Sequence, residues 1–245
     1  MKAMVLAAGV GSRLRPLTDH VPKPLVPVGA HPMIAYPLAV LRAAGIRDVL
    51  VNLHHLGDQI RIALGDGAAL GLSIRYSAED PILDTGGAIQ KAHDFLGDDT
   101  FVVINADILI DLPLVDVIAW HRQQGALATM VLRPDPHATR YGVIEIDAQA
   151  RIRRFLGQPR AVAETLRPLM FAGVHVFEPG VFDFMEPGRF GINAVTYPRM
   201  LAAGCPLFGY TFDGYWRVVD THAGLAEGRW DMLHPDTIAA VHHPS

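Results

Sequence analysis

The stretch best suited to chemistry is a glycine-rich run near the start of the chain, Leu6-Ala-Ala-Gly-Val-Gly-Ser-Arg-Leu-Arg-Pro-Leu-Thr18. Gly9 and Gly11 allow the backbone to turn tightly and to bring N–H groups, including that of Ala8, against an anion. The guanidinium of Arg13 can fork onto phosphate oxygens. The run therefore predicts a loop that binds a polyphosphate.

Two further cations strengthen this prediction. Arg15 adds hydrogen-bond donors, and Lys23 stands between Pro22 and Pro24, whose fixed φ angles limit where its ammonium can reach. The P-loop pattern G-x-x-x-x-G-K-[ST] is absent, and Leu14 occupies the third glycine position of G-x-G-x-x-G. A dinucleotide-dependent hydride-transfer enzyme is therefore disfavoured.

The elements that must position this loop alternate in type over the first hundred residues. Short apolar or β-branched runs at 2–8, 48–54, 73–78 and 100–106 predict strands, and helical patterns occupy 33–44, 56–64 and 88–96. Such alternation indicates βαβ units with a parallel sheet, which binds ligands at the carboxyl ends of its strands. The rule points to the loop after Ala8, the region around Asp84 and the turn Asn105-Ala-Asp107.

From about residue 112 the pattern changes to a helix over 115–124 followed mainly by short strands that suit antiparallel or mixed pairing. A final amphipathic helix is expected over 222–233. We predict an α/β fold with a Rossmann-like mixed, mainly parallel sheet flanked by helices. A single domain is expected over 1–235, with a nucleotide-binding lobe at 1–110, a sugar-phosphate lobe at 111–235 and a tail at 236–245.

Composition excludes several classes of protein. The 245 residues carry 21 basic and 25 acidic side chains without a basic stripe, which disfavours a nucleic-acid partner. No apolar stretch reaches the ~18 residues of a membrane span, and no secretion signal is recognisable at the start. The single cysteine, Cys205, suits a reducing compartment. We expect a cytoplasmic protein without a membrane partner, and its oligomeric state stays open.

The motif L-A-A-G-x-G-[ST]-R-[LM]-x-P-L-T, followed by P-K-P-[LM], resembles the entry motif of sugar-1-phosphate nucleotidyltransferases, also called nucleotide-sugar pyrophosphorylases. The resemblance extends from about residue 1 to residue 233. Leu83–Ala88 is similar to the glycine-rich nucleotide loop of that family, Val103–Asp107 to its metal-binding turn, and Phe171–Phe177 to its sugar-side strand. It implies a fold of the nucleotide-diphospho-sugar transferase type.

The reaction implied by the resemblance is attack of a sugar-1-phosphate oxygen on the α-phosphorus of a nucleoside triphosphate, which expels pyrophosphate. The loop amides and Arg13 would hold the triphosphate and the departing pyrophosphate. Lys23 would bridge the α-phosphate and the attacking phosphate, and Asp107 would bind Mg²⁺.

The resemblance also assigns residues to the nucleotide and the sugar. Gly86 and Gly87 would lie against the base, where only glycine leaves room, and Asp84 would contact the base or the ribose. On the sugar side, the backbone near Gly142 and Gly173 would contact the sugar.

The second metal carboxylate of the family departs from its pattern here. In Trp216-Arg-Val-Val-Asp-Thr221, aligned with W-x-D-[IV]-G-T, Val218 takes the carboxylate position and Asp220 replaces the glycine. Residues two apart on a strand share a face, so Asp220 can point to the same side. It would be displaced by roughly 6–7 Å at ~3.3 Å per residue, so a role as second ligand requires adjustment of the backbone.

Two other positions depart from the family. Gln158 stands where the sugar-side motif E-K-P has lysine. The positive charge of that lysine would have to come from another residue: Arg153, Arg154 or Arg160. In the metal-binding turn, alanine replaces the glycine of Asn-Gly-Asp, and a small residue is kept.

Several functions stay open. The resemblance favours guanylyl transfer to a mannose-like sugar phosphate, with a UTP-dependent N-acetylmuramate-1-phosphate uridylyltransferase as the alternative. A second alternative is a catalytically weak homologue that binds a nucleotide-sugar and regulates a partner. Zinc is rejected because His54 and His55 follow a strand, where adjacent residues point to opposite faces, and because the sequence has no H-x-x-x-H or H-E-x-x-H run. We expect His175 to be a packing residue.

Overall fold

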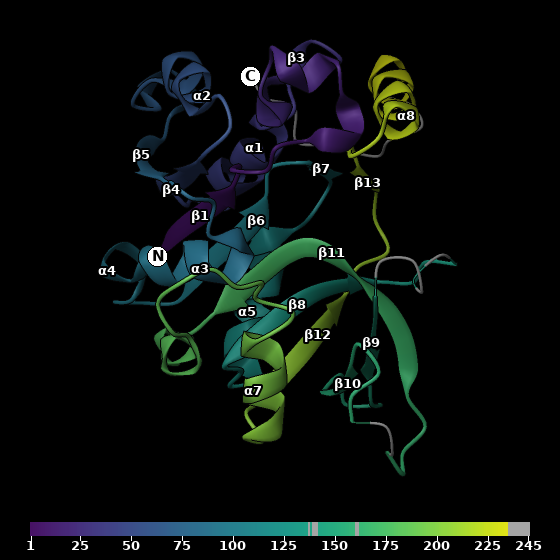
Figure 1. The fold of residues 1–245 in the computed structure, drawn as a ribbon. Helices are drawn as coiled ribbons and strands as arrows, with labels where there is room; N and C mark the ends of the chain where they lie inside the picture. Colours follow the sequence, from purple (N-terminus) through teal and green to yellow (C-terminus); the bar gives the residue numbers. More distant parts are fainter. Residues whose placement is uncertain (137, 139–141, 160–161, 235–245) are drawn as a thin grey trace. The chain divides into compact units, whose positions relative to one another are not determined.

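The computed structural model describes residues 1–136, 138, 142–159 and 162–234 (Figure 1). The chain divides into two compact units, which are described one at a time. The first comprises Met1–Ile82, Ile104–Leu114 and Gly214–Ser245, and the second comprises Leu83–Val103 and Val115–Asp213. The lobe boundary at residue 110 stays a prediction, and the predicted tail lies outside the described residues.

A parallel sheet is the centre of the first unit. Its strands are β1 (Lys2–Leu6), β4 (Asp48–Leu53) and β5 (Ser73–Ala78), with β4 between the other two. Val5 pairs with Val51 in the register of β1 and β4. β4 is buried after its first residue, as its continuous apolar run predicts for a strand covered on both faces. All three strands occur where the sequence predicts them.

Two helices connect these strands. α1 (Ala35–Ala43) precedes β4, and α2 (Gly57–Leu64) lies between β4 and β5. Ile60 and Leu64 of α2 are buried, whereas Ile62 is 83% exposed, so α2 buries one apolar stripe. Both helices lie inside the ranges that the apolar spacing predicts.

Two short strand pairs complete the first unit. β2 (Pro27–Val28) pairs with β3 (His31–Pro32), and β7 (Ile108–Ile110) pairs with β13 (Trp216–Val218), each pair antiparallel. The strands β2, β3 and β7 are not predicted from the sequence, because two or three residues are too few to show a period. Pairing with β13 brings the C-terminal part of the chain against the turn that contains Asp107.

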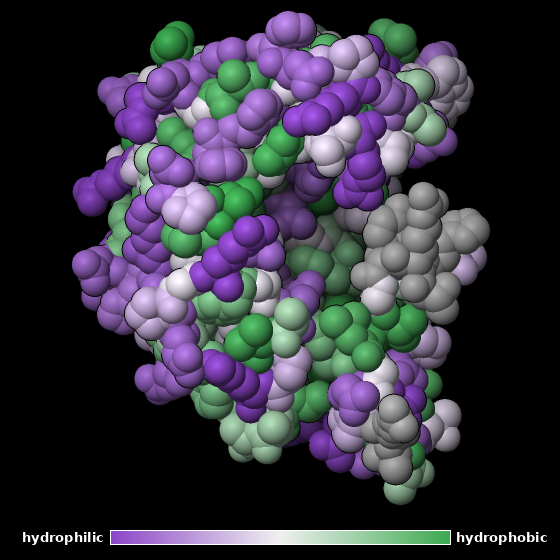
Figure 2. All heavy atoms as spheres, viewed as in Figure 1, coloured by the Kyte–Doolittle hydropathy of each residue, from purple (hydrophilic) through white to green (hydrophobic). Residues whose placement is uncertain are grey.

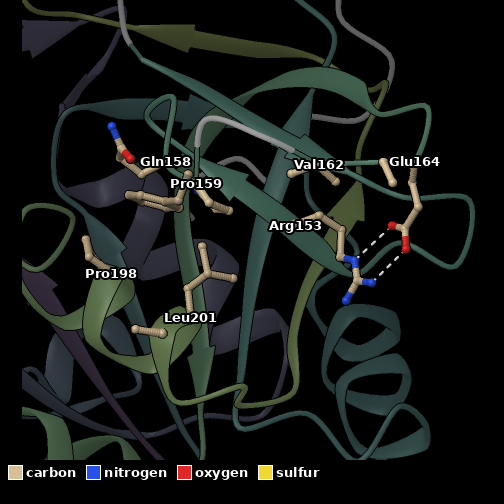
Figure 3. A pocket seen from close by; sticks show the side chains of 10 residues that line it. Arg153, Gln158, Pro159, Val162, Glu164, Pro198 and Leu201 are labelled. Carbon is tan, nitrogen blue, oxygen red and sulfur yellow. Dashed lines mark hydrogen bonds and ion pairs between the residues drawn. The ribbon is translucent and has the colours of Figure 1, made fainter.

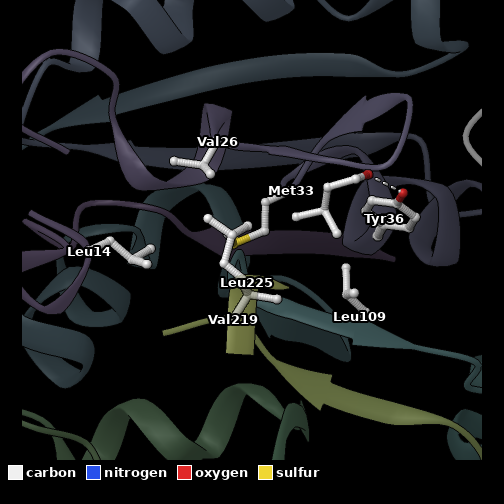
Figure 4. Close-up of a cluster of buried hydrophobic side chains, with 8 residues drawn as sticks. Leu14, Val26, Met33, Tyr36, Leu109, Val219 and Leu225 are labelled. Carbon is white, nitrogen blue, oxygen red and sulfur yellow. Dashed lines mark hydrogen bonds between the residues drawn. The ribbon is translucent and has the colours of Figure 1, made fainter. Parts of the chain in front are cut away.

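A hydrophobic cluster includes Leu14 of the glycine-rich run (Figure 4). It is built from distant parts of the first unit, and the Tyr36 hydroxyl donates to the carbonyl oxygen of Val28 over 2.6 Å inside it. Its buried members are Leu14, Val26, Val28, Met33, Tyr36, Leu109, Val219 and Leu225. Leu14, the residue that breaks the dinucleotide pattern, is therefore a core residue that anchors the run.

The last helix, α8 (His222–Leu233), has the predicted bounds but not the predicted simple amphipathic face. Asp231 is buried on it, and its Oδ2 accepts hydrogen bonds from the Tyr215 hydroxyl (2.7 Å) and from Arg217 Nε (2.5 Å). Trp230 is 53% exposed on the same helix. The helix is attached to β13 by a buried polar network as well as by apolar packing.

The second unit contains a mixed sheet in the order β10-β9-β11-β8-β12. These strands are β8 (Ala128–Arg133), β9 (Val143–Ile146), β10 (Ile152–Phe155), β11 (Arg167–Phe177) and β12 (Leu207–Thr211). The pairs β9–β10, β9–β11 and β8–β11 are antiparallel, and β8–β12 is parallel. The antiparallel pairs match the change of pattern after residue 112.

The remaining elements are helices and one strand. They are α3 (Asp84–Lys91), α4 (His93–Leu96), β6 (Phe101–Asn105), α5 (Leu114–Gln123), the 3-10 helix Pro179–Phe184 and α7 (Thr196–Ala202). β6 contributes its first three residues to the second unit and its last two to the first. Helices flank a mixed, mainly parallel sheet, so the predicted α/β fold class is confirmed.

Hydrophilic and hydrophobic residues are interspersed on the face drawn in Figure 2. The large hydrophobic side chains most exposed among the described residues are Ile62, Val115, Leu156, Trp230 and Leu233. No helix in the described ranges combines the length and the apolar character that crossing a membrane requires.

Candidate functional site

The glycine-rich loop begins where β1 ends, at the carboxyl edge of the parallel sheet. Gly11 has φ +69°, and a Cβ there would lie 3.0 Å from both Thr18 Cγ2 and Lys23 Cβ. The Thr18 hydroxyl also donates to the Gly11 carbonyl oxygen over 2.9 Å. Gly9 has no atom within 4 Å of such a Cβ position. Gly11 is therefore required by the conformation of the loop, whereas Gly9 leaves one side of it open.

Lys23 and Asp107 meet beside this loop. Lys23 Nζ lies 2.5 Å from Asp107 Oδ2, and their side chains are 11% and 29% exposed. Lys23 begins a 3-10 helix over Lys23–Leu25, while Asp107 follows β6. The amide of Ala106 donates to the Leu6 carbonyl oxygen over 3.1 Å, which fixes the turn next to the end of β1. The structure thus brings together two predicted site residues that are far apart in the sequence.

A second ion pair connects Arg13 with Asp220. Arg13 Nη1 lies 2.7 Å from Asp220 Oδ2, and the Asp220 side chain is 9% exposed. Val218, which occupies the expected carboxylate position, pairs with Ile108 across β13 and β7. The Val219 amide donates to the Asp107 carbonyl oxygen over 2.8 Å. Asp220 therefore shares the first unit with Asp107, but its observed partner is an arginine of the loop.

Two residues without a predicted role, Thr18 and His222, hold this loop. The Thr18 hydroxyl bonds to Gly11, as described above, and a ring nitrogen of His222 lies 2.9 Å from the Arg15 carbonyl oxygen. Thr221 caps α8, its Oγ1 accepting from the Gly224 amide over 3.1 Å. Thr18 stands inside the glycine-rich motif itself, but no pattern marks His222 as its neighbour.

The donors around Asp107 suit a magnesium ion. Asp107 and Asp220 supply carboxylate oxygens, the ligands that Mg²⁺ prefers, and Mg²⁺ is commonly held by one or two carboxylates plus substrate phosphates. No group of three or more His, Cys, Asp or Glu side chains placed to hold a metal occurs among the described residues. The two carboxylates, both in the first unit, fit a metal whose remaining ligands come from a substrate.

The predicted nucleotide residues Asp84, Gly86 and Gly87 lie in the second unit, where they open α3. The amides of both glycines donate to the Phe190 carbonyl oxygen, over 2.9 and 3.1 Å. A Cβ on Gly86 would lie 2.2 Å from Phe190 Cε2, and one on Gly87 2.1 Å from the Gly188 carbonyl oxygen. Close packing against the segment around Phe190 therefore also requires glycine at positions 86 and 87. Contact of these glycines with a base stays a prediction.

The helix was expected from Ala88, and α3 begins four residues earlier, at Asp84. Glycine is a poor helix former, so the glycine pair favoured a loop in the sequence. Tertiary hydrogen bonds to the segment around Phe190 override that preference. The Asp84 carboxylate accepts from the Thr85 amide over 2.6 Å.

The predicted sugar-side glycines both have left-handed backbone angles. Gly142 has φ +95°, and a Cβ there would lie 2.4 Å from Leu156 Cδ2. Gly173 has φ +93° and lies in β11 where the register against β8 shifts between Phe171 and His175. Glycine is thus required at a bulge and at a close approach. Contact with a sugar is not tested by these features and stays a prediction.

Two of the three arginines proposed to replace the sugar-side lysine are already paired. Arg153 Nη2 lies 2.8 Å from Glu164 Oε1, and Arg154 Nη1 lies 2.9 Å from Glu145 Oε1. Arg160 lies outside the described residues.

Gln158, Phe155 and Leu201 line a cavity of about 530 Å³ in the second unit, with the Arg153–Glu164 pair at its edge (Figure 3).

His175 is a packing residue, as predicted. Its side chain is 2% exposed, and its Nδ1 lies 2.8 Å from the hydroxyl of Tyr197. Burial lowers the pKa of the His175 imidazole to about 3 and raises that of the Tyr197 phenol. The histidine is therefore neutral and hydrogen-bonded in the core of the second unit.

The chain resembles known nucleotidyltransferases over most of its length. Residues 2–233 match the family model described as nucleotidyl transferase. The chain is 35% identical over 230 residues to "UTP--glucose-1-phosphate uridylyltransferase" of Synechocystis sp. (88% of this chain, 59% of the relative). It is 34% identical over 235 residues to "Mannose-1-phosphate guanylyltransferase" of Mycobacterium tuberculosis (94% of this chain, 64% of the relative). The chain thus spans about three fifths of the length of these curated relatives.

Among solved structures, a Bacillus anthracis protein described as a glucose-1-phosphate thymidylyltransferase, in complex with sucrose, has a TM-score of 0.81 at 25% identity. The match covers 99% of this chain and 98% of that one. HddC from Yersinia pseudotuberculosis has the same fold, with a TM-score of 0.77 at 18% identity over 94% of this chain and 98% of that one. From the family match over residues 2–233, this chain belongs to the nucleotidyl transferase family.

Proposed function

We propose that this chain is a nucleotidyltransferase that joins a nucleoside triphosphate and a sugar 1-phosphate to give a nucleoside diphosphate sugar and pyrophosphate. The observation that carries the proposal is the Lys23–Asp107 ion pair beside the glycine-rich loop in one compact unit. Amides and cations favour a triphosphate, and a carboxylate favours a hard divalent cation. The printed names of the curated relatives support the same class of reaction.

In the proposed reaction, an oxygen of the sugar phosphate forms a bond to the α-phosphorus while the bond to the β-phosphate oxygen breaks. Both reactants are anions, so the protein must mainly neutralise charge and align the groups. Lys23 would lie between the α-phosphate and the attacking phosphate. Arg13 and the amides of Ala8, Gly9 and Gly11 would hold the triphosphate and the departing pyrophosphate.

Asp107 would hold Mg²⁺, with Asp220 as the candidate for a second ligand. When bound, the ion supplies positive charge to phosphate oxygens. Asp84, Gly86 and Gly87 would contact the nucleotide, and Gly142 and Gly173 the sugar. These last assignments rest on the motifs that resemble the family.

The favoured substrates are GTP and a mannose-like sugar phosphate, since several relatives carry the name mannose-1-phosphate guanylyltransferase. UTP with glucose 1-phosphate is a second candidate, because the Synechocystis relative, at 35% identity, has that name. The N-acetylmuramate alternative and the weakly active regulatory homologue stay open as predictions.

The proposed partners are small molecules, a nucleoside triphosphate and a sugar 1-phosphate. A net charge of −4 and a sequence without a basic stripe disfavour a nucleic-acid partner. The single cysteine fits the reducing cytoplasm.

The test is pyrophosphate release with Mg²⁺, crossing the four nucleoside triphosphates with glucose, mannose, N-acetylglucosamine and N-acetylmuramate 1-phosphates. Release from one pair, lost in Asp107→Asn, supports the proposal and identifies the substrates. Asp116→Asn, on α5, is the matched control and should keep full activity. Nucleotide binding without release from any pair would instead support the regulatory homologue.

A further inference from the structure

A buried polar chain connects the ends of the three parallel strands of the first unit. The Ala7 amide, just after β1, donates to Asn52 Oδ1 over 2.6 Å. Asn52, near the end of β4, donates from Nδ2 to Glu79 Oε1 over 2.7 Å. Asn52 and Glu79 are 3% and 4% exposed. This series of hydrogen bonds therefore crosses the carboxyl edge of the sheet, where the glycine-rich loop begins.

The two partners of Asn52 determine how its amide is oriented. The Ala7 amide can only donate, and Glu79 Oε1 accepts from Asn52 Nδ2. Only one orientation of the Asn52 amide, with its oxygen toward Ala7, satisfies both groups. Glu79 thereby fixes Asn52, and Asn52 fixes the backbone from which the loop begins.

The backbone of Glu79 is held independently of its side chain. Its amide donates to the Leu53 carbonyl oxygen over 2.8 Å, and its carbonyl oxygen lies 2.9 Å from His54 Nδ1. Substitution of the Glu79 side chain therefore leaves this residue anchored at the end of β5. This anchoring allows the polarity of the buried chain to be changed without moving the strand.

We propose that Asn52 and Glu79 are positioning residues for nucleotide binding, an inference that rests on the proposed function. They act through the Ala7 amide, which lies two residues before Gly9. Ordering a free backbone costs about 1–2 kcal/mol per residue, so a loop ordered in advance binds an anion more tightly. Neither residue contacts the substrate in this role.

A polarity exchange tests the proposal. Asn52→Asp places a carboxylate against Glu79. Combining Asn52→Asp with Glu79→Gln restores both hydrogen bonds, because the new carboxylate accepts from the Ala7 amide and from the new side-chain amide at position 79. We expect Asn52→Asp to raise the KM for the nucleoside triphosphate about tenfold, a change of about 1.4 kcal/mol. The double variant should return to within about threefold of the wild type, and the KM for the sugar phosphate should not change. Asp48→Asn, at the other end of β4, is the control.

A second readout needs no substrate. NMR hydrogen exchange of the Ala7 amide should accelerate about tenfold in Asn52→Asp and slow again in the double variant. Equal KM defects in the single and double variants, or unchanged Ala7 exchange in both, would overturn the positioning role. Faster exchange with an unchanged KM would overturn its link to nucleotide binding. A wild-type chain with normal Ala7 exchange that neither binds nucleotide nor releases pyrophosphate would instead overturn the proposed function.

Discussion

The buried carboxylate of Asp220 holds the guanidinium of Arg13, with Nη1 and Oδ2 2.7 Å apart. Arg13 itself is 66% exposed, and Asp220 is 9% exposed. One end of the guanidinium is thus fixed by the protein while its other donors face outward. This arrangement suits an arginine that is oriented for a phosphate.

We therefore expect Asp220→Asn to act through Arg13. The KM for the nucleoside triphosphate should rise about tenfold, within the range of a lost hydrogen bond to a charged group. If Asp220 acts only as the partner of Arg13, the Mg²⁺ concentration for half-maximal activity should stay unchanged. Steady-state kinetics over a Mg²⁺ series measure both quantities, and a rise in the Mg²⁺ requirement would identify Asp220 as a metal ligand instead.

Removal of metal should abolish turnover if Asp107 binds Mg²⁺. Chelation with EDTA should stop pyrophosphate release, and added Mg²⁺ should restore it. Asp107→Asn should lower kcat by about 10²–10³, the usual effect of removing one group that stabilises charge in the transition state. Full activity in EDTA would contradict a metal-dependent reaction. Thermal unfolding of the variant checks that loss of the Lys23 ion pair has not unfolded the protein.

Gly9 and Gly11 should respond differently to alanine. Gly11→Ala forces a side chain into φ +69° and against Thr18 and Lys23, so the free energy of unfolding should fall by about 1–3 kcal/mol. Gly9→Ala meets no atom within 4 Å and should keep its stability. Its KM for the nucleoside triphosphate should nevertheless rise, because the methyl group would occupy the open side of the loop. Urea denaturation and kinetics separate the two effects, and a Gly9→Ala variant with unchanged KM would place the triphosphate elsewhere.

The packing of α3 against the segment around Phe190 can be tested by a double-mutant cycle. Gly86→Ala meets the Phe190 ring at 2.2 Å and should lower the free energy of unfolding by about 1–3 kcal/mol. Phe190→Ala should relieve that clash, so the pair should be coupled by about 0.5–3 kcal/mol. Gly87→Ala meets the backbone oxygen of Gly188, so Phe190→Ala should not rescue it. Additive effects in the Gly86 cycle would show that the ring does not limit this position.

Buried His175 should make stability depend on pH. Its pKa is lowered from 6.5 to about 3 in the folded protein, so between these values the unfolded chain binds a proton that the folded chain does not. Stability is therefore lost as the pH falls below about 6.5, by up to about 1.4 kcal/mol per pH unit. His175→Gln should make this loss shallower in urea denaturation between pH 7.5 and 5. An unchanged slope in His175→Gln would contradict the prediction.

The sequence by itself determined the α/β class and most of the helices and strands. It also singled out Gly9, Gly11, Arg13, Lys23 and Asp107 as candidate site residues. Local patterns sufficed there, because strand and helix periods are visible in short windows and a glycine-rich run marks itself by composition. The family motifs extended these predictions along most of the chain. The motifs match although this chain spans only about three fifths of the length of its curated relatives.

Only the tertiary structure decided which side chains meet. The pairs Lys23–Asp107 and Arg13–Asp220 join residues on separate segments of the first unit, and the Asn52–Glu79 pair joins two strand ends. The pairing of the strands determines which of these distant side chains come into contact, and a short window of sequence does not contain that information. The same reason explains the early start of α3, where hydrogen bonds to Phe190 outweigh the low helix propensity of two glycines.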